Sequence, residues 1–460
     1  MSDYNQFLQR KTQFGGDSGF NPVWMPDFLF DFQQTLVERS LLKGRSAIFA
    51  DCGLGKSPMQ LAWAENVVRK TNKRVLIATP LAVSDQTIRE GQKFGIEAAR
   101  SKSGILPAAK IVVTNYESLH RFNPSDFAGM VCDESSILKS FDGVTRKLIT
   151  EFMRRLPYRL LCTATAAPND YPEIGTSSEA LGELGYTDMM TRFFKTDTSI
   201  PARIGLRDGG PKARVRFKHH AQEPFWKWVC SWARACRKPS DLGFDDGKFI
   251  LPPLIERVTV VKASKSLPGF LPGIEVPAIG RQEQLAELRN TLAERCEAAA
   301  RKILENGRTA VAWCNLNPEG DLLEHLLPGS KQLKGSQSDD EKEEILSAFS
   351  RGQFKYLVSK AKITCFGLNW QHCAYTTMFP SYSFEQYYQM IRRFLRFGQI
   401  ETVIAEMITT EGQRDVLLSL QRKARAADEM FSSLVKHMNE SMRVARSEYQ
   451  APAWEVPAWL

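Results

Sequence analysis

The sequence predicts an α/β fold made of two units of similar size, each with a parallel sheet covered by helices. Short apolar segments at 46–50, 74–78 and 110–114 alternate with helical stretches, as is typical of parallel strands that are buried on both faces. The pattern lapses after Pro168 and returns near residue 281. A chain of 460 residues with 43% hydrophobic residues is long enough to bury both cores.

The first unit is expected over residues 27–180, after an aperiodic N-terminal arm at 1–26. A helix is predicted from Phe28 to about Lys43, because Gly44 follows it. Buried strands are then predicted at 46–50, 74–78, 110–114, 129–132 and 158–162. Residues 181–262 are expected to form a basic, partly helical insertion or linker that ends at the prolines of segment 251–254.

The second unit is expected over residues 263–414. Its first helix, at 281–306, carries an apolar stripe and ends at Gly307. Ser338 and Glu341 have the spacing of a capping box before another helix, and strands are predicted at 309–313, 355–359 and 374–378. Residues 415–450 are expected to form a C-terminal helical extension. In the tail at 451–460, Pro-Ala-Trp occurs twice; a docking peptide for a protein partner, a segment packed on a lobe and an inert end all remain open.

The net charge of +9 is concentrated in one segment. Residues 192–238 contain twelve basic and three acidic residues, so the rest of the chain is neutral overall. Such a local excess favours contacts with a phosphate backbone, with a solvated basic face as the alternative. Arg214, Arg216 and Lys218 are the candidate contacts. Phe225, Val229 and Trp232 recur at helical spacing and are expected in the core, whereas Trp226 and Trp228 remain open.

Composition and patterning exclude several classes of protein. No apolar run approaches the length of a membrane span, and the N-terminus lacks the apolar segment of a secretory signal. The nine cysteines include no Cys-x-x-Cys pair, which argues against a disulfide framework or a zinc site. We therefore expect no membrane partner and a reducing, cytoplasmic location.

A glycine-rich segment, Ala-Asp-Cys-Gly-Leu-Gly-Lys-Ser at 50–57, lies between a predicted strand and a predicted helix. Gly53 and Gly55 would let backbone N–H groups surround phosphate oxygens at a helix N-terminus. Lys56 would neutralise the β- and γ-phosphates of a nucleotide, and Ser57 would hold Mg²⁺. Ala50 stands where the strict phosphate-loop pattern has a glycine, so a chance glycine-rich turn is the alternative.

Two carboxylates, Asp133 and Glu134, follow the buried strand at 129–132. Parallel α/β sheets place ligands at the carboxyl ends of their strands. Asp133 would hold Mg²⁺ through water, and Glu134 would orient and deprotonate an attacking water molecule. By itself such a pair most often belongs to a turn, but together with Lys56 on the same sheet it indicates a nucleotide hydrolase.

From residue 29 to residue 399, the chain resembles superfamily 2 nucleic-acid-dependent ATPases, above all the compact Swi/Snf-like translocases of bacteriophages. Segment 50–57 matches the family's A-x-x-G-x-G-K-[ST] form, which accounts for Ala50. The resemblance implies two tandem RecA-like lobes. It also implies adenine reading by Gln33, nucleic-acid contacts by Thr79, Pro80, Thr114, Asn115 and Asn369, coupling by Thr163 and Thr165, a nucleotide-site glycine at Gly367, and an arginine-finger motif made of Gln389, Arg393 and Arg396.

The sequence also departs from the family pattern. Ser136 replaces the histidine of the acidic box, Thr364 and Cys365 replace glycines, and Leu395 replaces a histidine before Arg396. None of these changes removes a phosphate ligand, but each could alter how hydrolysis couples to DNA.

The resemblance implies a motor that uses ATP and Mg²⁺ and moves on duplex or forked DNA. Replication, recombination or fork remodelling in the host cytoplasm of a bacteriophage are the expected settings. Because both arginines lie in the same chain as the phosphate loop, a monomer is expected. The alternatives are a strand-separating helicase on DNA or RNA and, in another class, an ATP-gated recruitment protein that binds nucleic acid. The second unit's motifs disfavour a small-molecule kinase.

Overall fold

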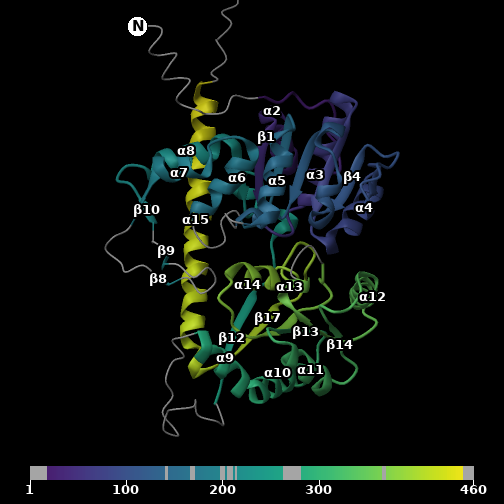
Figure 1. Ribbon diagram of the computed structural model, residues 1–460, viewed down its shortest axis with the longest axis vertical. Helices are drawn as coiled ribbons and strands as arrows, with labels where there is room; N and C mark the ends of the chain where they lie inside the picture. The colour runs from purple at the N-terminus through teal and green to yellow at the C-terminus, as the bar shows by residue number, and fades with distance from the viewer. Residues whose placement is uncertain are drawn as a thin grey trace, which may run out of the picture.

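Two parallel sheets, each covered by helices, form two lobes in the computed structural model, which describes residues 18–139, 143–165, 171–196, 203–204, 211–212, 215–262, 281–364 and 369–448. The lobes lie one above the other, and a long C-terminal helix runs beside both (Figure 1). The predicted fold class, two RecA-like lobes with a C-terminal helical extension, is confirmed. The phosphate-loop segment belongs to the first lobe, and the arginine motif belongs to the second.

The first lobe is built on a seven-stranded sheet in the order β11-β1-β6-β5-β2-β4-β3. Its central strands are buried on both faces, which explains their continuous apolar sequence. The strands are β1 (Arg45–Ala50), β2 (Arg74–Thr79), β3 (Ala98–Arg100), β4 (Ile111–Asn115), β5 (Phe127–Asp133), β6 (Tyr158–Cys162) and β11 (Ala233–Cys236). The helices are α2 (Asp31–Lys43), α3 (Lys56–Thr71), α4 (Ser84–Lys93), α5 (Val144–Arg154), α6 (Ile174–Leu181), α7 (Tyr186–Phe193) and α8 (Gln222–Trp232).

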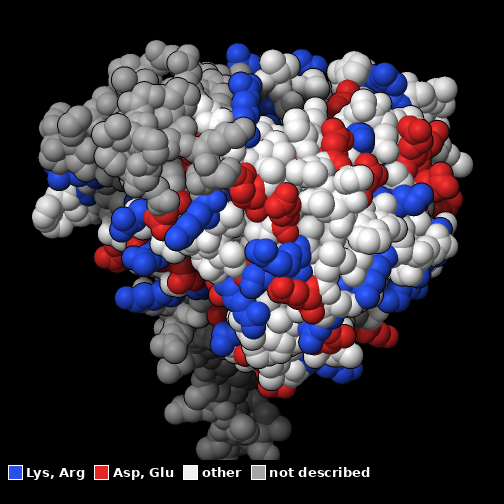
Figure 2. All heavy atoms as spheres, turned by 90° about the horizontal axis from the view of Figure 1, so that it is seen from below, with Lys and Arg blue, Asp and Glu red and all other residues white. Residues whose placement is uncertain are grey.

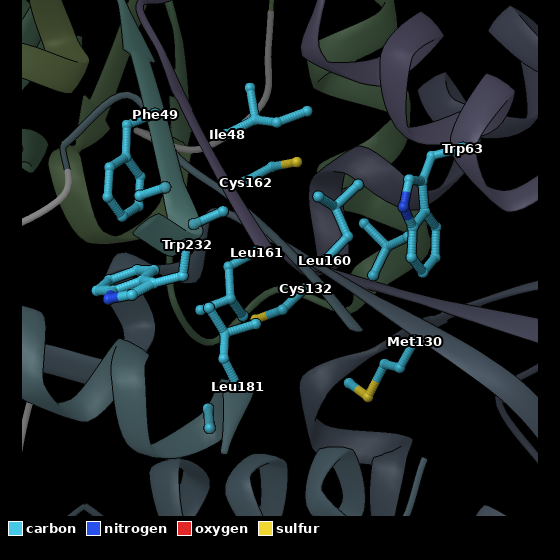
Figure 3. Close-up of a cluster of buried hydrophobic side chains, with 14 of the residues drawn as sticks. Ile48, Phe49, Trp63, Met130, Cys132, Leu160, Leu161, Cys162, Leu181 and Trp232 are labelled. Carbon is cyan, nitrogen blue, oxygen red and sulfur yellow. The ribbon is translucent and has the colours of Figure 1, made fainter. Parts of the chain in front are cut away.

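The core of the first lobe lies on both faces of this sheet (Figure 3). Because successive side chains of a strand point to opposite faces, neighbouring residues of β1 and β6 meet different helices. Phe49 lies beside Trp232, with ring centroids 6.1 Å apart, while Leu160 lies on the side of Trp63. The phosphate-loop segment therefore emerges from a strand that is packed on both sides.

The expected insertion at 181–262 is corrected only in part by the structure. Two small separate sheets lie within it, one of β7 (Phe194–Thr196) with β10 (Val215–Phe217) and one of β8 (Arg203–Ile204) with β9 (Pro211–Lys212). Other elements of this range belong to the two lobes. Strand β11 extends the first sheet by pairing with β1, with Ala47 opposite Ala233. Further on, β12 (Leu254–Val261) pairs along its length with β17 (Val403–Thr410) in the second sheet. The boundary between the lobes therefore falls between Cys236 and Leu254. Helix α8 is part of the first core; Phe225, Val229 and Trp232 are buried there as predicted, and so are Trp226 and Trp228.

The second lobe has a six-stranded parallel sheet in the order β12-β17-β16-β13-β15-β14. Its remaining strands are β13 (Ala310–Cys314), β14 (Lys331–Leu333), β15 (Tyr356–Lys360) and β16 (Tyr375–Met378). Its helices are α9 (Arg281–Asn290), α10 (Leu292–Asn306), α11 (Asn317–Leu326), α12 (Asp339–Ser350), α13 (Ala361–Thr364) and α14 (Phe384–Ile391). The predicted capping box is present at α12, where the Ser338 hydroxyl accepts a hydrogen bond from the Glu341 N–H.

Helix α15 (Arg414–Glu448) joins the lobes a second time. Leu420, near its start, is buried in the core of the second lobe, whereas Met430, Leu434 and Met438 are buried in the core of the first. The helix packs along α8 and β11 (Figure 1). None of the helices in the described ranges is both long and apolar enough to cross a membrane. The tail at 451–460 and the arm up to residue 17 lie outside the described residues.

Candidate active site between the two lobes

The phosphate-loop segment has the backbone that its glycines predict. Gly53 and Gly55 have φ angles of +87° and +75°, a region that only glycine enters without strain. Both positions also have close neighbours, a side chain at Gly55 and the backbone of the other lobe at Gly53. A Cβ on Gly55 would lie 2.3 Å from Nε2 of Gln33, and a Cβ on Gly53 would lie 2.6 Å from the backbone nitrogen of Phe397 in the second lobe.

Lys56 begins helix α3, and its ammonium group turns back toward the loop. Its Nζ donates to the carbonyl oxygens of Ala50, at 3.0 Å, and Asp51, at 3.3 Å. Burial opposes the charged form, but the neighbouring Cys52 and Glu134 raise the pKa of Lys56 above its ordinary value. The side chain is thus a charged group held at the loop.

Asp133 and Glu134 form a buried pair of carboxylates at the end of β5. Asp133 is 6% exposed, and its Oδ1 accepts a hydrogen bond of 2.6 Å from the Gln60 amide. Burial, followed by the charge of Glu134, raises the pKa of Asp133 to about 7, although Gln60 opposes this rise. A divalent cation beside this carboxylate would offset the cost of its charge. The donor set, with the Ser57 hydroxyl nearby on the same cavity, therefore fits Mg²⁺.

The predicted coupling motif contacts this carboxylate pair. The Thr163 hydroxyl donates to Oε2 of Glu134 at 3.4 Å, and the Thr165 N–H donates to the Thr163 hydroxyl at 3.1 Å. Glu134 has a φ of +51°, which turns the chain directly after β5. In contrast, the buried Ser136 hydroxyl has no hydrogen-bond partner among the described residues. The serine in the histidine position therefore does not link the acidic box to the coupling motif.

The arginine motif of the second lobe faces the same site. Arg393 is 2% exposed and donates from Nη2 to Oε1 of Gln389 at 2.8 Å. Gln389 is fully buried and does not line the cavity, so it positions Arg393, which differs from the expected direct role. Burial, together with the charge of Arg393, lowers the pKa of Arg396 below its ordinary value. Two cations are thus held close together, with Arg393 buried and Arg396 partly exposed.

A cavity of about 560 Å³ brings these groups together. The first lobe contributes Lys56, Ser57, Asp133 and Glu134, and the second contributes Asn369, Arg393 and Arg396. Asn369, for which a nucleic-acid contact is predicted, also lines this cavity. The charged region continues into an aromatic one beside Gln33, formed by Phe28, Phe30, Phe94, Phe249 and Phe397. Such a cavity suits a ligand with a polyanionic part and a planar, apolar part.

Gln33 is placed at the aromatic region by local hydrogen bonds. Its Oε1 accepts from the Phe30 N–H at 3.0 Å, and its Nε2 donates to the Leu54 carbonyl at 2.9 Å. Each of these amide atoms retains capacity for one further hydrogen bond. The Gln33 side chain therefore connects the start of α2 to the phosphate-loop segment by hydrogen bonds and can still contact a ligand in the cavity.

Sequence reasoning missed four groups at the site: Asp51, Gln60, Phe249 and Phe397. Gln60 could have been predicted from the sequence, because it follows Lys56 by one helical turn and therefore lies on the same face of α3. Phe249 and Phe397 contact each other with ring centroids 4.9 Å apart. They come from the connection between the lobes and from the second lobe, and no local pattern predicts that pairing.

The predicted strand-end contacts for nucleic acid are adjacent but largely buried. Strands β2 and β4 pair so that Thr79 lies opposite Asn115. The Thr79 and Thr114 side chains are fully buried, which differs from the expected direct contact. The Asn115 side chain accepts from the Ser118 N–H at 3.1 Å and caps the following turn. Pro80 is partly exposed and is the most accessible of the four predicted strand-end residues, Thr79, Pro80, Thr114 and Asn115.

The basic segment is partly neutralised by ion pairs. Lys227 pairs with Glu223 at 2.7 Å, and Arg237 pairs with Asp428 of α15. Arg216, on the strand β10 (Val215–Phe217), and Lys218 are exposed. Among the described residues on the face shown in Figure 2, basic and acidic side chains are interspersed. Arg214 and Gly367 lie outside the described residues.

Comparisons with known proteins leave the function to be decided by the site. No family model matches the sequence, and no curated protein is significantly similar to it. Among solved structures, the chain is similar to the SWI2/SNF2 ATPase core of Sulfolobus solfataricus in complex with double-stranded DNA. That similarity covers 93% of this chain and 98% of the other, with 17% identity and a TM-score of 0.41. With a TM-score this low, it carries no conclusion about activity.

Proposed function

We propose that the chain is a nucleic-acid-stimulated ATPase of superfamily 2, related to the Swi/Snf-like translocases, that moves on duplex or forked DNA. The cavity between the lobes carries the proposal, because Lys56, Asp133 and Glu134 line it together with Arg393 and Arg396. Cations from both lobes suit a chain of phosphates. The aromatic region beside Gln33 suits a nucleobase, for which we propose adenine.

The first lobe would bind and orient the nucleotide. Lys56 would contact the β- and γ-phosphates, and the N–H groups around Gly53 and Gly55 would donate to phosphate oxygens. Ser57 and Asp133 are the residues that would hold Mg²⁺, which neutralises charge on the phosphoryl group when it is bound. Glu134 would accept a proton from the attacking water, while the Thr163 hydroxyl orients this carboxylate.

The second lobe would complete the site. Arg393 and Arg396 would meet the charge that develops on the terminal phosphate, an effect worth about 10³–10⁵ in rate in other phosphoryl-transfer enzymes. Because the arginines belong to the second lobe, ATP would favour the closed arrangement of the lobes and hydrolysis would release it. Alternating closure would move a nucleic acid that contacts both lobes.

The nucleic-acid part of the proposal rests on charge and position. The basic excess at 192–238 favours binding to a phosphate backbone, and the paired ends of β2 and β4 bring two strand-end motifs to one edge of the sheet. We propose a monomer as the working unit, because one chain supplies both the phosphate loop and the arginines. The Trp-containing tail at 451–460 remains a candidate site for a protein partner.

The nucleotide role is tested with Glu134→Gln, and Glu151→Gln, an exposed position on α5, is the matched control. Turnover of ATP should fall by at least about 10²-fold in the first variant, while binding of ATP is retained because Lys56 and Ser57 are intact. The control should match the wild type. Wild-type turnover in Glu134→Gln, or no binding of ATP by the wild type, would contradict the proposal.

The substrate is tested by measuring wild-type turnover with duplex DNA, forked DNA, single-stranded DNA and RNA. Stimulation by duplex or forked DNA supports the translocase. Stimulation by single strands, with separation of a labelled duplex, supports a strand-separating helicase. Biological function retained in Glu134→Gln would instead support an ATP-gated recruitment protein.

A further inference from the structure

A cluster of polar side chains joins the phosphate-loop segment to the second lobe behind the cavity. Oδ2 of Asp51 accepts a hydrogen bond from Nη2 of Arg392 at 2.6 Å. Its Oδ1 accepts from the Tyr388 hydroxyl and from the Cys52 N–H. Tyr388 belongs to α14 of the second lobe, and Arg392 is the residue that follows this helix. Both carboxylate oxygens of Asp51 are therefore used, and each has a partner in the other lobe.

The environment of this cluster makes its separation costly. The Asp51 side chain is 6% exposed and that of Arg392 is 18% exposed. Burial opposes the charge on Arg392, but Asp51 raises the pKa of the guanidinium above its ordinary value. The Arg392 guanidinium also lies 5.2 Å from the centre of the Tyr388 ring. Moving the lobes apart would remove both the cationic partner and the Tyr388 hydroxyl from the Asp51 carboxylate next to the phosphate loop.

The cluster lies directly beside the groups that would act in the cavity. Arg392 precedes Arg393 directly after the end of α14, and Arg396 follows three residues later in the turn. Asp51 likewise precedes Cys52 and Gly53, which line the cavity, whereas Asp51, Tyr388 and Arg392 do not. Gly53 contacts Phe397 and Arg396 closely enough that a Cβ there would lie 3.2 Å from Cβ of Arg396. Helix α14 is also attached to the first lobe by an ion pair between Lys139 and Glu385, so the position of both arginines relative to Lys56 depends in part on its attachment to Asp51.

We propose that Asp51, Arg392 and Tyr388 form a latch that holds the lobes closed and positions Arg393 and Arg396 at the cavity. The three are positioning residues, since none lines the cavity. The effect of the latch on turnover rests on the proposed function, whereas its effect on the separation of the lobes does not.

Another contact between the lobes provides a matched control. Arg100 of β3 pairs with Glu343 of α12, with Nη1 and Oε1 3.5 Å apart. This pair is more exposed, since the Glu343 side chain is 39% exposed, and it involves neither the phosphate loop nor α14. If the loss of any ion pair between the lobes separated them, Glu343→Gln would also increase the distance between the lobes. If the latch is specific, this variant keeps the wild-type distance.

The test compares Asp51→Asn, Arg392→Gln, the double variant and Glu343→Gln by two measurements. Asparagine retains the acceptor for the Cys52 N–H, so the loop itself is preserved. The distance between the lobes is measured by double electron–electron resonance between spin labels at Glu151→Cys and Glu297→Cys, both exposed positions. We expect longer or broader distances in Asp51→Asn and Arg392→Gln, no further change in the double variant, and wild-type distances in Glu343→Gln.

Turnover supplies the second measurement. The kcat for ATP should fall by at least about tenfold in Asp51→Asn and Arg392→Gln, since a displacement of about 1 Å in a catalytic group can cost 10²-fold. The KM should change less, because Lys56 and Ser57 remain in place. Arg392→Lys retains a positive charge that reaches Asp51, so its kcat should lie between those of Arg392→Gln and the wild type. If Asp51→Asn fails to fold, comparing Arg392→Lys with Arg392→Gln still tests the latch.

Unchanged distances in both single variants, or additive effects in the double variant, would overturn the latch. If the wild type hydrolyses ATP but the distances do not change, the latch fails and the proposed function stands. If the distances change as expected but the wild type does not hydrolyse ATP, the proposed function fails and the latch stands.

Discussion

The buried carboxyl of Asp133 should make the stability of the protein depend on pH, and Asp133→Asn should remove this dependence. The folded state raises its pKa from 3.8 to about 7, through burial and then through the charge of Glu134. Asparagine has the same shape and no charge, and its carbonyl oxygen can still accept the hydrogen bond from Gln60. The substitution therefore removes the charge and leaves the packing in place.

The sign and size of the effect follow from this pKa. Between the two values, the folded chain holds a proton that the unfolded chain has released, so the free energy of unfolding falls as the pH rises through this range. Above pH 7 the free energy of unfolding is lowered by the full cost of ionising the Asp133 carboxyl in the folded state. A difference of about three pKa units corresponds to about 4 kcal/mol, which is an upper limit because water can enter the site. We expect Asp133→Asn to gain at least about 2 kcal/mol at pH 8, or roughly 2 °C in Tm for a chain of 460 residues, and little at pH 4.

Thermal unfolding of both proteins at the two pH values, with a chelator and without nucleotide, measures this gain. Asp126→Asn, at an exposed position, is the control and should change Tm equally little at both pH values. A gain from Asp133→Asn that is the same at pH 4 and pH 8, or a loss at pH 8, would refute the role assigned to the buried charge.

Three further substitutions test the packing between and within the lobes. Leu434→Ala should lower the free energy of unfolding by about 2–5 kcal/mol in urea titrations, because Leu434 of α15 is 1% exposed in the core of the first lobe; a change below 1 kcal/mol would contradict docking of this helix. Arg295→Met should cost about 3–5 kcal/mol, because Arg295 and Glu319 pair at 2.8 Å with both side chains fully buried; the double variant that also carries Glu319→Leu should be more stable than Arg295→Met alone. Gly53→Ala should cost more than the roughly 1–2 kcal/mol of a left-handed backbone, because its Cβ would meet Phe397 of the other lobe. Gly243→Ala, with a φ of +85° and nothing within 4 Å of its Cβ, should show the backbone cost alone, and an equal cost at both glycines would contradict the close approach of the lobes.

The sequence was most informative where chemistry is local. The phosphate-loop segment was predicted from Gly53, Gly55 and Lys56, because a strand, a tight turn and a helix N-terminus are set by neighbouring residues. The helical spacing of Phe225, Val229 and Trp232 likewise predicted their burial in α8. In each case the determining interactions lie within a few residues of one another.

Other features could not be predicted from the sequence because they depend on distant partners. Strand β12 was placed in an insertion, since its sequence does not reveal that it pairs with β17, which lies more than a hundred residues later. The nucleic-acid contact predicted for Asn369 stays a prediction, and only the approach of the lobes shows that this residue lines the cavity. The sequence assigned Gln389 a direct role, and it does not reveal that this side chain is buried and accepts a hydrogen bond from Arg393.

By itself, the sequence determined the two helix-covered sheets and the residues that could bind a nucleotide, because apolar periodicity and glycine-containing turns act over short distances. Only the tertiary structure decided that these residues share one cavity, that an aromatic region completes it, and that Asp51 is tied to Arg392. The reason is that each half of the cavity is stable within its own lobe, while the contact between the halves depends on where α14, α15 and the connection between the lobes place them.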